Sequence, residues 1–330
     1  MGSEMCIRDR ITRVGLYGAG DIADLHAAGI QGCESAELVG LFDIDKERSH
    51  EKSLQYNCTA YDSAESLLGD PDIDAIFVLT PLEEHFECAV SSLRAGKHVL
   101  LEKPVSSNIN EIEQIKSVAE ESGKLCVPVH NYLYEDSVIR TRELLDSGKL
   151  GDLVAIYVFY NIHHPEEVAR RYPGVIRQIL THHAYITSFI GGKPRKAMAM
   201  ASTINDGTVT KENLAMAILE LDGGALAHLQ ASFAADDHAD DNWTFKIKLI
   251  GTSGSTRFSH ADWVQNEKAV VHSHTYSAYH YSILNTVRYF IEQCIERDRA
   301  PLSDLDDAIT VQKIIEAIEV SVGEGVAIEL

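Results

Sequence analysis

A glycine-rich stretch near the N-terminus constrains the fold of this chain more than any other feature. The residues Gly18, Ala19, Gly20, Asp21, Ile22 and Ala23 follow the apolar run RVGLY (13–17) and open a stretch with helical periodicity at 22–30. Small residues at the first, third and sixth positions permit a tight turn, let a ligand approach the backbone, and let the helix pack closely on the strand. The pattern predicts a strand–turn–helix unit that binds a phosphate group at the helix N-terminus.

The first third of the chain continues with short apolar runs that alternate with helical stretches. Strands are predicted at 13–17, 37–43, 74–80, 97–102 and 124–130, and helices at about 22–30, 45–56, 83–95 and 109–122. This alternation implies parallel pairing, and apolar runs without polar alternation indicate strands that are buried on both faces. Residues 11–130 are therefore predicted to form an α/β domain of the Rossmann type, with a doubly wound parallel sheet.

An acidic residue stands where such a domain holds the adenosine ribose of a dinucleotide. Asp43 ends the second predicted strand, 20 positions after Ala23. A carboxylate at this place accepts hydrogen bonds from the ribose hydroxyls and repels a 2′-phosphate, so NAD is expected and NADP is less favoured. Lys46 and Arg48 lie close enough to keep NADP in consideration. The alternative interpretation is that the glycines form only a turn and that Asp43 only caps the strand end.

The pattern changes beyond residue 130. Helices are predicted at about 136–147, 175–190, 281–297 and 305–322, whereas the region between 194 and 259 is dominated by strand-like runs joined by the short turns DGG (222–224) and GTSG (251–254). Consecutive strands with short connections imply a mostly antiparallel, open sheet with helices on one face. Residues 131–330 are therefore predicted to form a second, α+β domain.

The composition excludes several classes of function. Twenty-nine basic against 50 acidic residues give a formal charge of −21, which disfavours nucleic acid and anionic membranes as partners. The longest apolar runs have the length of strands, not of membrane spans. Six cysteines without a close pair indicate reduced thiols in a cytoplasmic protein. Residues 1–10 mix charges of both signs and are interpreted as a leader or an expression remnant, not as a signal peptide.

Several motifs along the chain resemble one family of enzymes. AGKHVLLEKP (95–104) is the most specific, and TPLEEH (80–85), VGLYGAGDIADLH (14–26), GKLGDLVAI (148–156) and GTSGS (251–255) are also similar. Together they resemble the glucose–fructose oxidoreductase/inositol dehydrogenase (Gfo/Idh/MocA) family. The resemblance implies an NAD(P)-dependent oxidoreductase whose cofactor also contacts the residues Thr80, Pro81, His85, Glu102 and Lys103.

Lys103 is the first candidate catalytic residue. It follows a predicted parallel strand, at the carboxyl end where open α/β sheets bind ligands. An ammonium group there can bind the reacting oxygen and stabilise the negative charge that develops as hydride leaves. The resemblance implies a cis peptide bond between Lys103 and Pro104, which would fix the direction of the side chain. The alternative is a surface lysine in a turn.

The resemblance also implies catalytic partners on a helix of the second domain. The usual aspartate, the histidine four residues later and a further acidic residue correspond here to Gln178, His182 and Tyr185. These positions share one helical face. Because glutamine cannot titrate, proton transfer is expected from His182, with Gln178 and Tyr185 orienting substrate hydroxyls. A one-residue slip would present His183 instead, and a buried structural histidine is an alternative for either residue.

Other candidates come from the segment around these positions. His163, His164, Arg170, Arg171 and His183 are further expected substrate contacts, since arginines can bind a carboxylate or phosphate. No metal is expected: DDHADDN (236–242), His272, His274 and His280 lack a ligand spacing on a defined helix.

The expected reaction is hydride transfer at a CH–OH carbon of a sugar, polyol or sugar acid. Two alternatives stay open: an enzyme that keeps NAD bound while catalysing a net non-redox reaction, such as glycoside cleavage, epimerisation or isomerisation, and a non-catalytic dinucleotide-binding regulator. The resemblance further implies a homodimer or homotetramer, assembled through the open sheet of the second domain.

Overall fold

The computed structural model describes residues 11–164, 166–204, 211–235, 243–259, 261–265, 270–274 and 277–330. The chain divides into two compact units, an N-terminal unit of residues up to 131 together with 283–305, and a C-terminal unit of 132–282 with 306–330. The sequence predicted one boundary at 130/131; the structure adds the returning segment 283–305 to the first unit. The predicted leader at 1–10 and the acidic segment 236–242 lie outside the described residues.

The N-terminal unit is built on a six-stranded parallel sheet with the strand order β3-β2-β1-β4-β5-β6. Its strands are β1 (Thr12–Tyr17), β2 (Ala36–Phe42), β3 (Thr59–Ala60), β4 (Ala75–Val78), β5 (His98–Leu101) and β6 (Cys126–Pro128). All four residues of β4 are buried, as expected for a central strand that is covered on both faces. The predicted doubly wound fold is confirmed.

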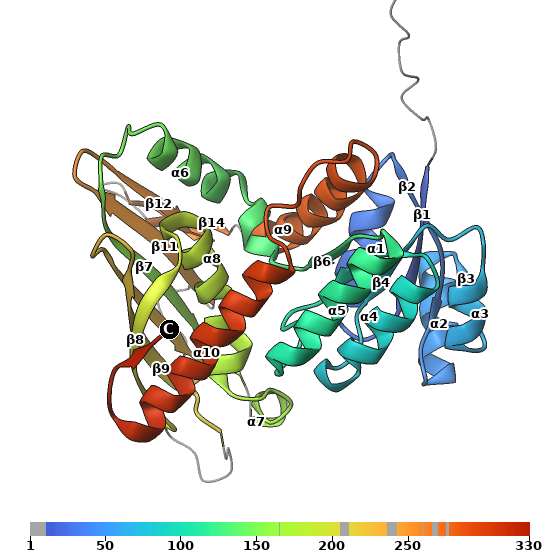
Figure 1. Ribbon diagram of the computed structural model, residues 1–330, viewed down its shortest axis with the longest axis horizontal. Coiled ribbons are helices and arrows are strands. Elements are labelled where there is room, and N and C mark those ends of the chain that lie inside the picture. Colours follow the sequence, from blue (N-terminus) through green and yellow to red (C-terminus); the bar gives the residue numbers. More distant parts are fainter. Residues whose placement is uncertain are drawn as a thin grey trace, which may run out of the picture. The chain divides into compact units, whose positions relative to one another are not determined.

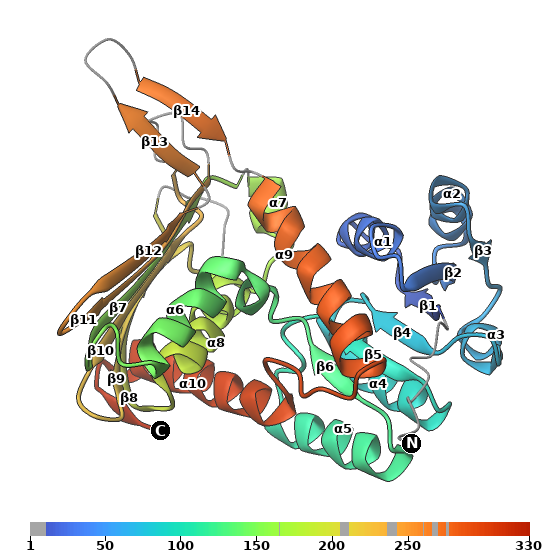
Figure 2. The ribbon, with the colours of Figure 1, turned by 90° about the horizontal axis from the view of Figure 1, so that it is seen from above.

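Helices cover both faces of this sheet. They are α1 (Ala23–Gln31), α2 (Lys46–Tyr56), α3 (Ala64–Gly69), α4 (His85–Arg94) and α5 (Ile109–Ser122). Figure 2 shows α1 and α2 on one face, with α4 and α5 on the other. Short polar side chains fix the N-termini: Asp45 accepts from two amides at the start of α2, and Asn108 caps α5. The returning segment packs on α1, because a Cβ at Gly29 would lie 3.1 Å from Val287.

The C-terminal unit contains a seven-stranded sheet with the order β12-β11-β7-β10-β9-β8-β15 (Figure 1). Its strands are β7 (Leu153–Ile162), β8 (Pro194–Ser202), β9 (Leu214–Leu221), β10 (Leu226–Ser232), β11 (Trp243–Gly251), β12 (Ser255–Ser259) and β15 (Ile328–Glu329). β7 and β10 pair in parallel, and the other neighbours pair antiparallel. A separate hairpin pairs β13 (Ala261–Gln265) with β14 (Val270–His274). The predicted mostly antiparallel sheet is confirmed.

Three helices of this unit, α6 (Asp136–Asp146), α8 (Thr181–Gly191) and α10 (Leu305–Glu324), lie on one face of the sheet (Figure 2). The inward side chains of β7, β9 and β10 alternate with outward ones, as an open sheet with one covered face requires. On the outer face Met198, Met200, Met216 and Ile218 stay exposed, so this face is apolar.

Two predicted helices are interrupted. The helix expected at 175–190 begins with a π-helical turn, η3 (Ile176–Leu180), before α8; the one expected at 281–297 consists of α9 (Ser277–Arg288) and the π-helical η4 (Tyr289–Ile295). An extra residue in a turn changes which side chains share a face, so hydrophobic periodicity alone does not show it. Among the described residues, no helix combines the length and apolar character needed to cross a membrane.

Candidate functional site

The glycine-rich turn between β1 and α1 has the geometry of a phosphate-binding loop. Gly18 has φ of +102°, and a Cβ there would lie 2.8 Å from the carbonyl of Leu79, so a side chain is excluded on two grounds. A Cβ on Gly20, in contrast, would meet nothing within 4 Å. The space above Gly20 is therefore open to a ligand. Ala23 is fully buried where the helix packs on the sheet.

Asp43 lies directly beside this turn. One carboxylate oxygen accepts from the amide of Ala19 at 2.8 Å, and the other accepts from the amide of Asp45 at 2.9 Å. The carboxylate thus holds the glycine-rich turn in place. Each oxygen has a second lone pair that can accept from a ribose hydroxyl. Arg48 binds Asp45 at 2.9 Å and approaches Asp43 to 4.0 Å, so the cation near this position is already paired.

The turn after β5 carries Lys103, and the peptide bond to Pro104 is cis, as the resemblance implied. The preceding carboxylate of Glu102 is buried, with Oε1 2.9 Å from His26 Nε2 and Oε2 accepting from the amide of Lys103 at 3.0 Å. Burial raises the pKa of Glu102, but the hydrogen bond and charge of His26, with Lys103, lower it below its ordinary value. Both carboxylate oxygens of Glu102 are bound by groups of the protein itself. This favours a structural role for Glu102, which is to hold the turn that carries Lys103.

Two features around Lys103 act on its pKa in opposite directions. Burial lowers the pKa of Lys103, and the carboxylate of Glu102 partly offsets this effect. A weakly hydrated cation interacts more strongly with a developing alkoxide than one in bulk water does. His130, a buried neighbour, donates to or accepts from Ser303 at 2.7 Å, and burial lowers its pKa to about 3, so it adds no charge near neutrality.

His85, which the resemblance implies as a cofactor contact, is buried. Its Nδ1 lies 2.8 Å from the carbonyl of Pro104 and its Nε2 lies 2.9 Å from the carbonyl of Thr80. The imidazole therefore links the loop after β4 to the loop after β5. Thr80 and Pro81 follow β4 at the carboxyl edge of the sheet, where both loops meet.

The C-terminal unit carries the other candidate catalytic residues. His182 is almost fully buried, and its Nδ1 lies 2.7 Å from the hydroxyl of Tyr185, whose oxygen also accepts from the amide of Tyr132 at 3.3 Å. Gln178 belongs to the π-helical turn η3 that precedes α8 and is half-buried. The structure thus brings His182 and Tyr185 together, and η3 carries Gln178.

His183, the neighbouring alternative, lies in the core. It is fully buried, neither ring nitrogen has a hydrogen-bond partner among the residues that the structure describes, and its ring lies 6.3 Å from that of Phe245. Burial lowers the pKa of His183 to about 3, which keeps the ring neutral. This environment favours His182 over His183 as the proton-exchanging residue.

The remaining candidates lie in the segment between β7 and η3. His164 packs against Phe233 and Tyr172 at ring distances of 4.6 and 5.4 Å. His163, Arg170 and Arg171 are exposed around α7 (Glu166–Ala169). In the part of the chain that the structure describes, no three His, Cys, Asp or Glu side chains are arranged to bind a metal. The side chains of His272 and His274 lie outside the described residues.

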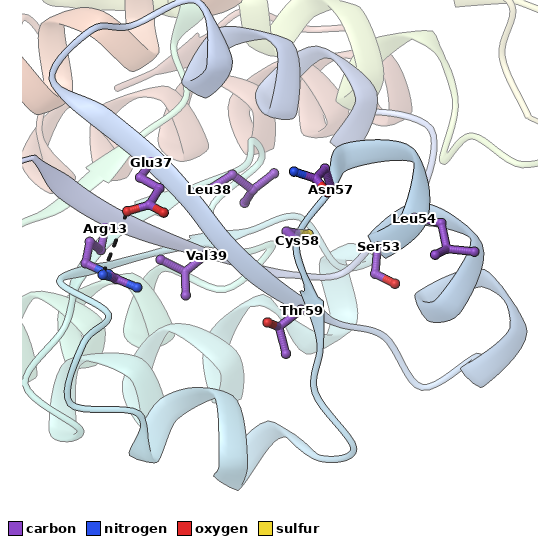
Figure 3. A pocket seen from close by; sticks show the side chains of 9 residues that line it. All are labelled: Arg13, Glu37, Leu38, Val39, Ser53, Leu54, Asn57, Cys58 and Thr59. Carbon is purple, nitrogen blue, oxygen red and sulfur yellow. Dashed lines mark ion pairs between the residues drawn. The ribbon is translucent and has the colours of Figure 1, made fainter.

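A separate pocket of about 440 Å³ lies elsewhere in the N-terminal unit (Figure 3). It is lined by Arg13, Glu37, Leu38, Val39, Ser53, Leu54, Asn57, Cys58 and Thr59. Arg13 and Glu37, 3.8 Å apart, stand near the amino ends of β1 and β2. Open α/β sheets bind their ligands beyond the carboxyl ends, so this pocket is not the dinucleotide site.

Comparison with known proteins gives a family for both units. Residues 12–130 match the model described as an oxidoreductase family with an NAD-binding Rossmann fold, and residues 138–257 match the GFO/IDH/MocA C-terminal domain. The chain belongs to the Gfo/Idh/MocA family of oxidoreductases. The predicted resemblance is confirmed, and so is the NAD-binding character of the N-terminal unit.

Curated Gfo/Idh/MocA relatives match most of the chain at low identity. The 1,5-anhydro-D-fructose reductase of Ensifer adhaerens is 28% identical over 232 residues, which cover 68% of this chain and 70% of the relative. The myo-inositol 2-dehydrogenase of Thermotoga maritima is 22% identical over 249 residues, which cover 73% of each.

Solved structures show the same fold over nearly the whole length. The scyllo-inositol dehydrogenase of Lactobacillus casei, solved with NAD(H) and scyllo-inositol, has a TM-score of 0.87 at 19% identity and covers 97% of this chain and 99% of its own. The enzyme GenD2 of gentamicin A biosynthesis, solved with NAD, has a TM-score of 0.86 at 19% identity and covers 97% of this chain and 98% of its own.

Proposed function

We propose that this protein is an NAD-dependent oxidoreductase that transfers hydride between the nicotinamide and a CH–OH carbon of a sugar, polyol or sugar acid. The observation that carries the proposal is the placement of Lys103 at the carboxyl end of β5, on the sheet that also carries the glycine-rich turn. Membership of an NAD-binding oxidoreductase family supports it. The named relatives act on inositols and on an anhydro-sugar, which supports this substrate class.

The residues of the N-terminal unit fit a dinucleotide. Gly18 permits the tight turn, Gly20 leaves room for the pyrophosphate at the start of α1, and Asp43 faces the same turn and can hold the ribose hydroxyls. The nicotinamide, when bound, accepts or supplies the hydride. NAD is preferred in this proposal because a 2′-phosphate would meet the carboxylate of Asp43, while Arg48 is paired with Asp45.

The chain's own residues bind the substrate oxygen and move its proton. Lys103 binds the reacting oxygen and stabilises the alkoxide, and the carboxylate of Glu102 favours the ammonium form against the effect of burial on its pKa. His182 takes the hydroxyl proton during oxidation and returns it during reduction. Gln178, which replaces the aspartate of the family pattern, can hydrogen-bond a hydroxyl but cannot carry a proton.

The outer face of the C-terminal sheet supports a homo-oligomer. A shallow apolar pocket of about 420 Å³ on this face is lined by residues that include Met198, Met200, Met216 and Ile218. Exposed apolar patches of this kind mark protein interfaces. We expect light scattering to give the mass of a dimer or tetramer. The double variant Met200→Glu, Ile218→Glu should have a smaller mass in solution.

The free thiols of Cys33, Cys58, Cys88, Cys126 and Cys294 support a reducing, cytoplasmic location.

A spectrophotometric screen tests the proposed reaction. Inositols, sugar alcohols, aldoses and sugar acids are offered with NAD and, separately, with NADP, and the absorbance of the reduced nicotinamide is followed. We expect oxidation of at least one compound with NAD. Saturable NAD binding without any activity would contradict an enzyme and support a regulator, whereas product formation without accumulation of NADH would support a net non-redox reaction.

A further inference from the structure

His26 is a polar residue in the interior of the N-terminal unit. It lies on α1 with none of its surface exposed, and its ring stands edge-on to that of Phe77 in β4, 5.7 Å away. Its Nε2 lies 2.9 Å from Oε1 of Glu102, whereas its Nδ1 has no hydrogen-bond partner among the residues that the structure describes. A buried nitrogen without a partner costs stability. An apolar side chain would therefore suit this position better, unless the contact with Glu102 is needed.

The contact between His26 and Glu102 has a defined direction. An ionised carboxylate can only accept hydrogen bonds, so Nε2 of His26 carries a proton and donates it, whether or not Nδ1 is protonated as well. The other carboxylate oxygen, Oε2, accepts from the amide of Lys103 at 3.0 Å. The carboxylate thus receives one donor from α1 and one from the turn after β5. Without the imidazole, Oε1 would lose a donor in a buried place, which favours protonation of the carboxyl group.

We propose that His26 is a positioning residue that acts through Glu102, and that its Nε2–H holds this carboxylate ionised and directed toward the turn that carries Lys103. The inference rests on the proposed function, in which Lys103 is the catalytic residue. The negative charge of Glu102 favours the ammonium form of Lys103, whereas burial disfavours it. In this role His26 needs no contact with substrate or cofactor, and its loss weakens turnover through the charge of Glu102.

The titratable groups around this carboxylate come from three parts of the N-terminal unit. Burial raises the pKa of Glu102, but the contact with His26 of α1 and the charge of Lys103 lower it below its ordinary value. His130, which follows β6, is a further titratable group near Lys103, and burial lowers its pKa to about 3. His130 is therefore neutral near neutral pH and does not titrate in the range of the experiments below.

Two substitutions of His26 separate the hydrogen-bond donor from the shape of the side chain. His26→Leu fills the site with an apolar side chain and removes the donor, whereas His26→Gln supplies an amide N–H at a similar reach. His98→Leu is the matched control. It removes a half-buried histidine of the same unit, at the amino end of β5, where Nδ1 accepts from the amide of Leu125 at 3.2 Å.

The carboxyl carbon resonance of Glu102 reports its ionisation without cofactor, substrate or turnover. It is observed in protein labelled with ¹³C at the glutamate side-chain carboxyl groups and is assigned by its absence in Glu102→Gln. We expect an ionised carboxylate near neutral pH in the wild type, in His26→Gln and in His98→Leu. In His26→Leu the titration of Glu102 should move to higher pH, so that the protonated form is populated near neutrality.

Turnover gives a second readout of the same variants. Near neutral pH, kcat of His26→Leu should fall roughly tenfold while KM changes less than about twofold, and His26→Gln should recover most of the loss. A Glu102 carboxylate that stays ionised in His26→Leu would overturn the proposal. So would a His26→Gln variant that behaves as His26→Leu does, because the donor would then not be what matters.

The wild-type protein tests the contact even if His26→Leu does not fold. In ¹⁵N-histidine-labelled protein we expect a slowly exchanging proton on Nε2 of His26, assigned by its absence in His26→Gln. An unprotonated Nε2, or a proton in fast exchange with water, would also overturn the proposal. If the wild-type protein oxidises no alcohol, the proposed function fails, while the two resonance experiments still decide whether His26 holds Glu102 ionised.

Discussion

His26 and Glu102 form a buried pair, with Nε2 of the histidine 2.9 Å from Oε1 of the carboxylate. His26 lies on α1, directly after the glycine-rich turn, and Glu102 precedes Lys103 and accepts from its amide. The helix at which the phosphates are proposed to bind is thereby connected to the turn that carries the proposed catalytic lysine. Both elements belong to the N-terminal unit, so the connection exists within one compact part of the molecule.

The carboxylate of Glu102 is predicted to keep Lys103 charged. Because Glu102 raises the pKa of Lys103 against the effect of burial, Glu102→Gln should lower that pKa. The alkaline limb of the kcat profile should then move to lower pH, and kcat should fall roughly tenfold. The exposed Glu113→Gln serves as the control, and identical pH profiles for the two variants would refute the role of Glu102.

Asp43 is predicted to select NAD. Asp43→Ser removes the group that repels a 2′-phosphate and the acceptor of the Ala19 amide. The ratio of kcat/KM for NAD to that for NADP should fall by roughly tenfold or more. The exposed Asp62→Asn variant should keep the wild-type ratio. An unchanged ratio in Asp43→Ser would show that the ribose is bound elsewhere.

Gly18 is predicted to tolerate no side chain. Gly18→Ala adds a Cβ that would lie 2.8 Å from the Leu79 backbone, at a φ that favours glycine. The free energy of unfolding should fall by about 2 kcal/mol or more, and NAD binding should weaken. Gly69→Ala, where the added Cβ would meet nothing within 4 Å, should change little. Thermal melting and calorimetric titration with NAD distinguish these outcomes.

Glu135 is predicted to make the unfolding free energy depend on pH. The folded protein binds its proton up to a pKa of about 7, whereas the unfolded chain releases it near the ordinary value of 4.5. The resulting stabilisation is complete at pH values below the pKa of Glu135 in the unfolded chain. It is lost as pH rises through the pKa in the folded protein, which lowers the free energy of unfolding by about 3 kcal/mol. Glu135→Gln should therefore gain stability over the wild type at pH 8 and not at pH 4. Both free energies of unfolding are measured by denaturant titration. The same difference between the two proteins at pH 8 and at pH 4 would contradict the assignment.

The fold was largely predictable because its signals are local. The strands of the first unit are apolar runs such as 74–80, and glycine, aspartate and asparagine mark their turns and caps. β3, by contrast, has only two residues, both exposed, and its sequence resembles a loop. The π-helical turn η3 was not predictable either, since a single widened turn has no periodic pattern of its own by which the sequence could show it.

The candidate site was predictable only in part. Gly18, Asp43 and Lys103 stand in sequence motifs, and the residue types and spacing of these motifs predict their roles. The contact of His26 with Glu102 joins residues 76 positions apart, and no periodic pattern in one sequence relates them. His26 ends the quoted motif VGLYGAGDIADLH, which is the one signal that could have singled it out. The tyrosine partner of His182 lay in the predicted helix, but its inward direction depends on packing against Tyr132.

The most direct test of the account is the turnover of Lys103→Ala with NAD and the best alcohol substrate from the screen. The variant removes the ammonium group that is proposed to stabilise the alkoxide and leaves Gly18, Gly20 and Asp43 in place. We predict that kcat falls by roughly a thousandfold or more, while the Kd for NAD, measured by calorimetry, stays within about twofold. Turnover that survives this change at near wild-type rate would contradict the central role of Lys103.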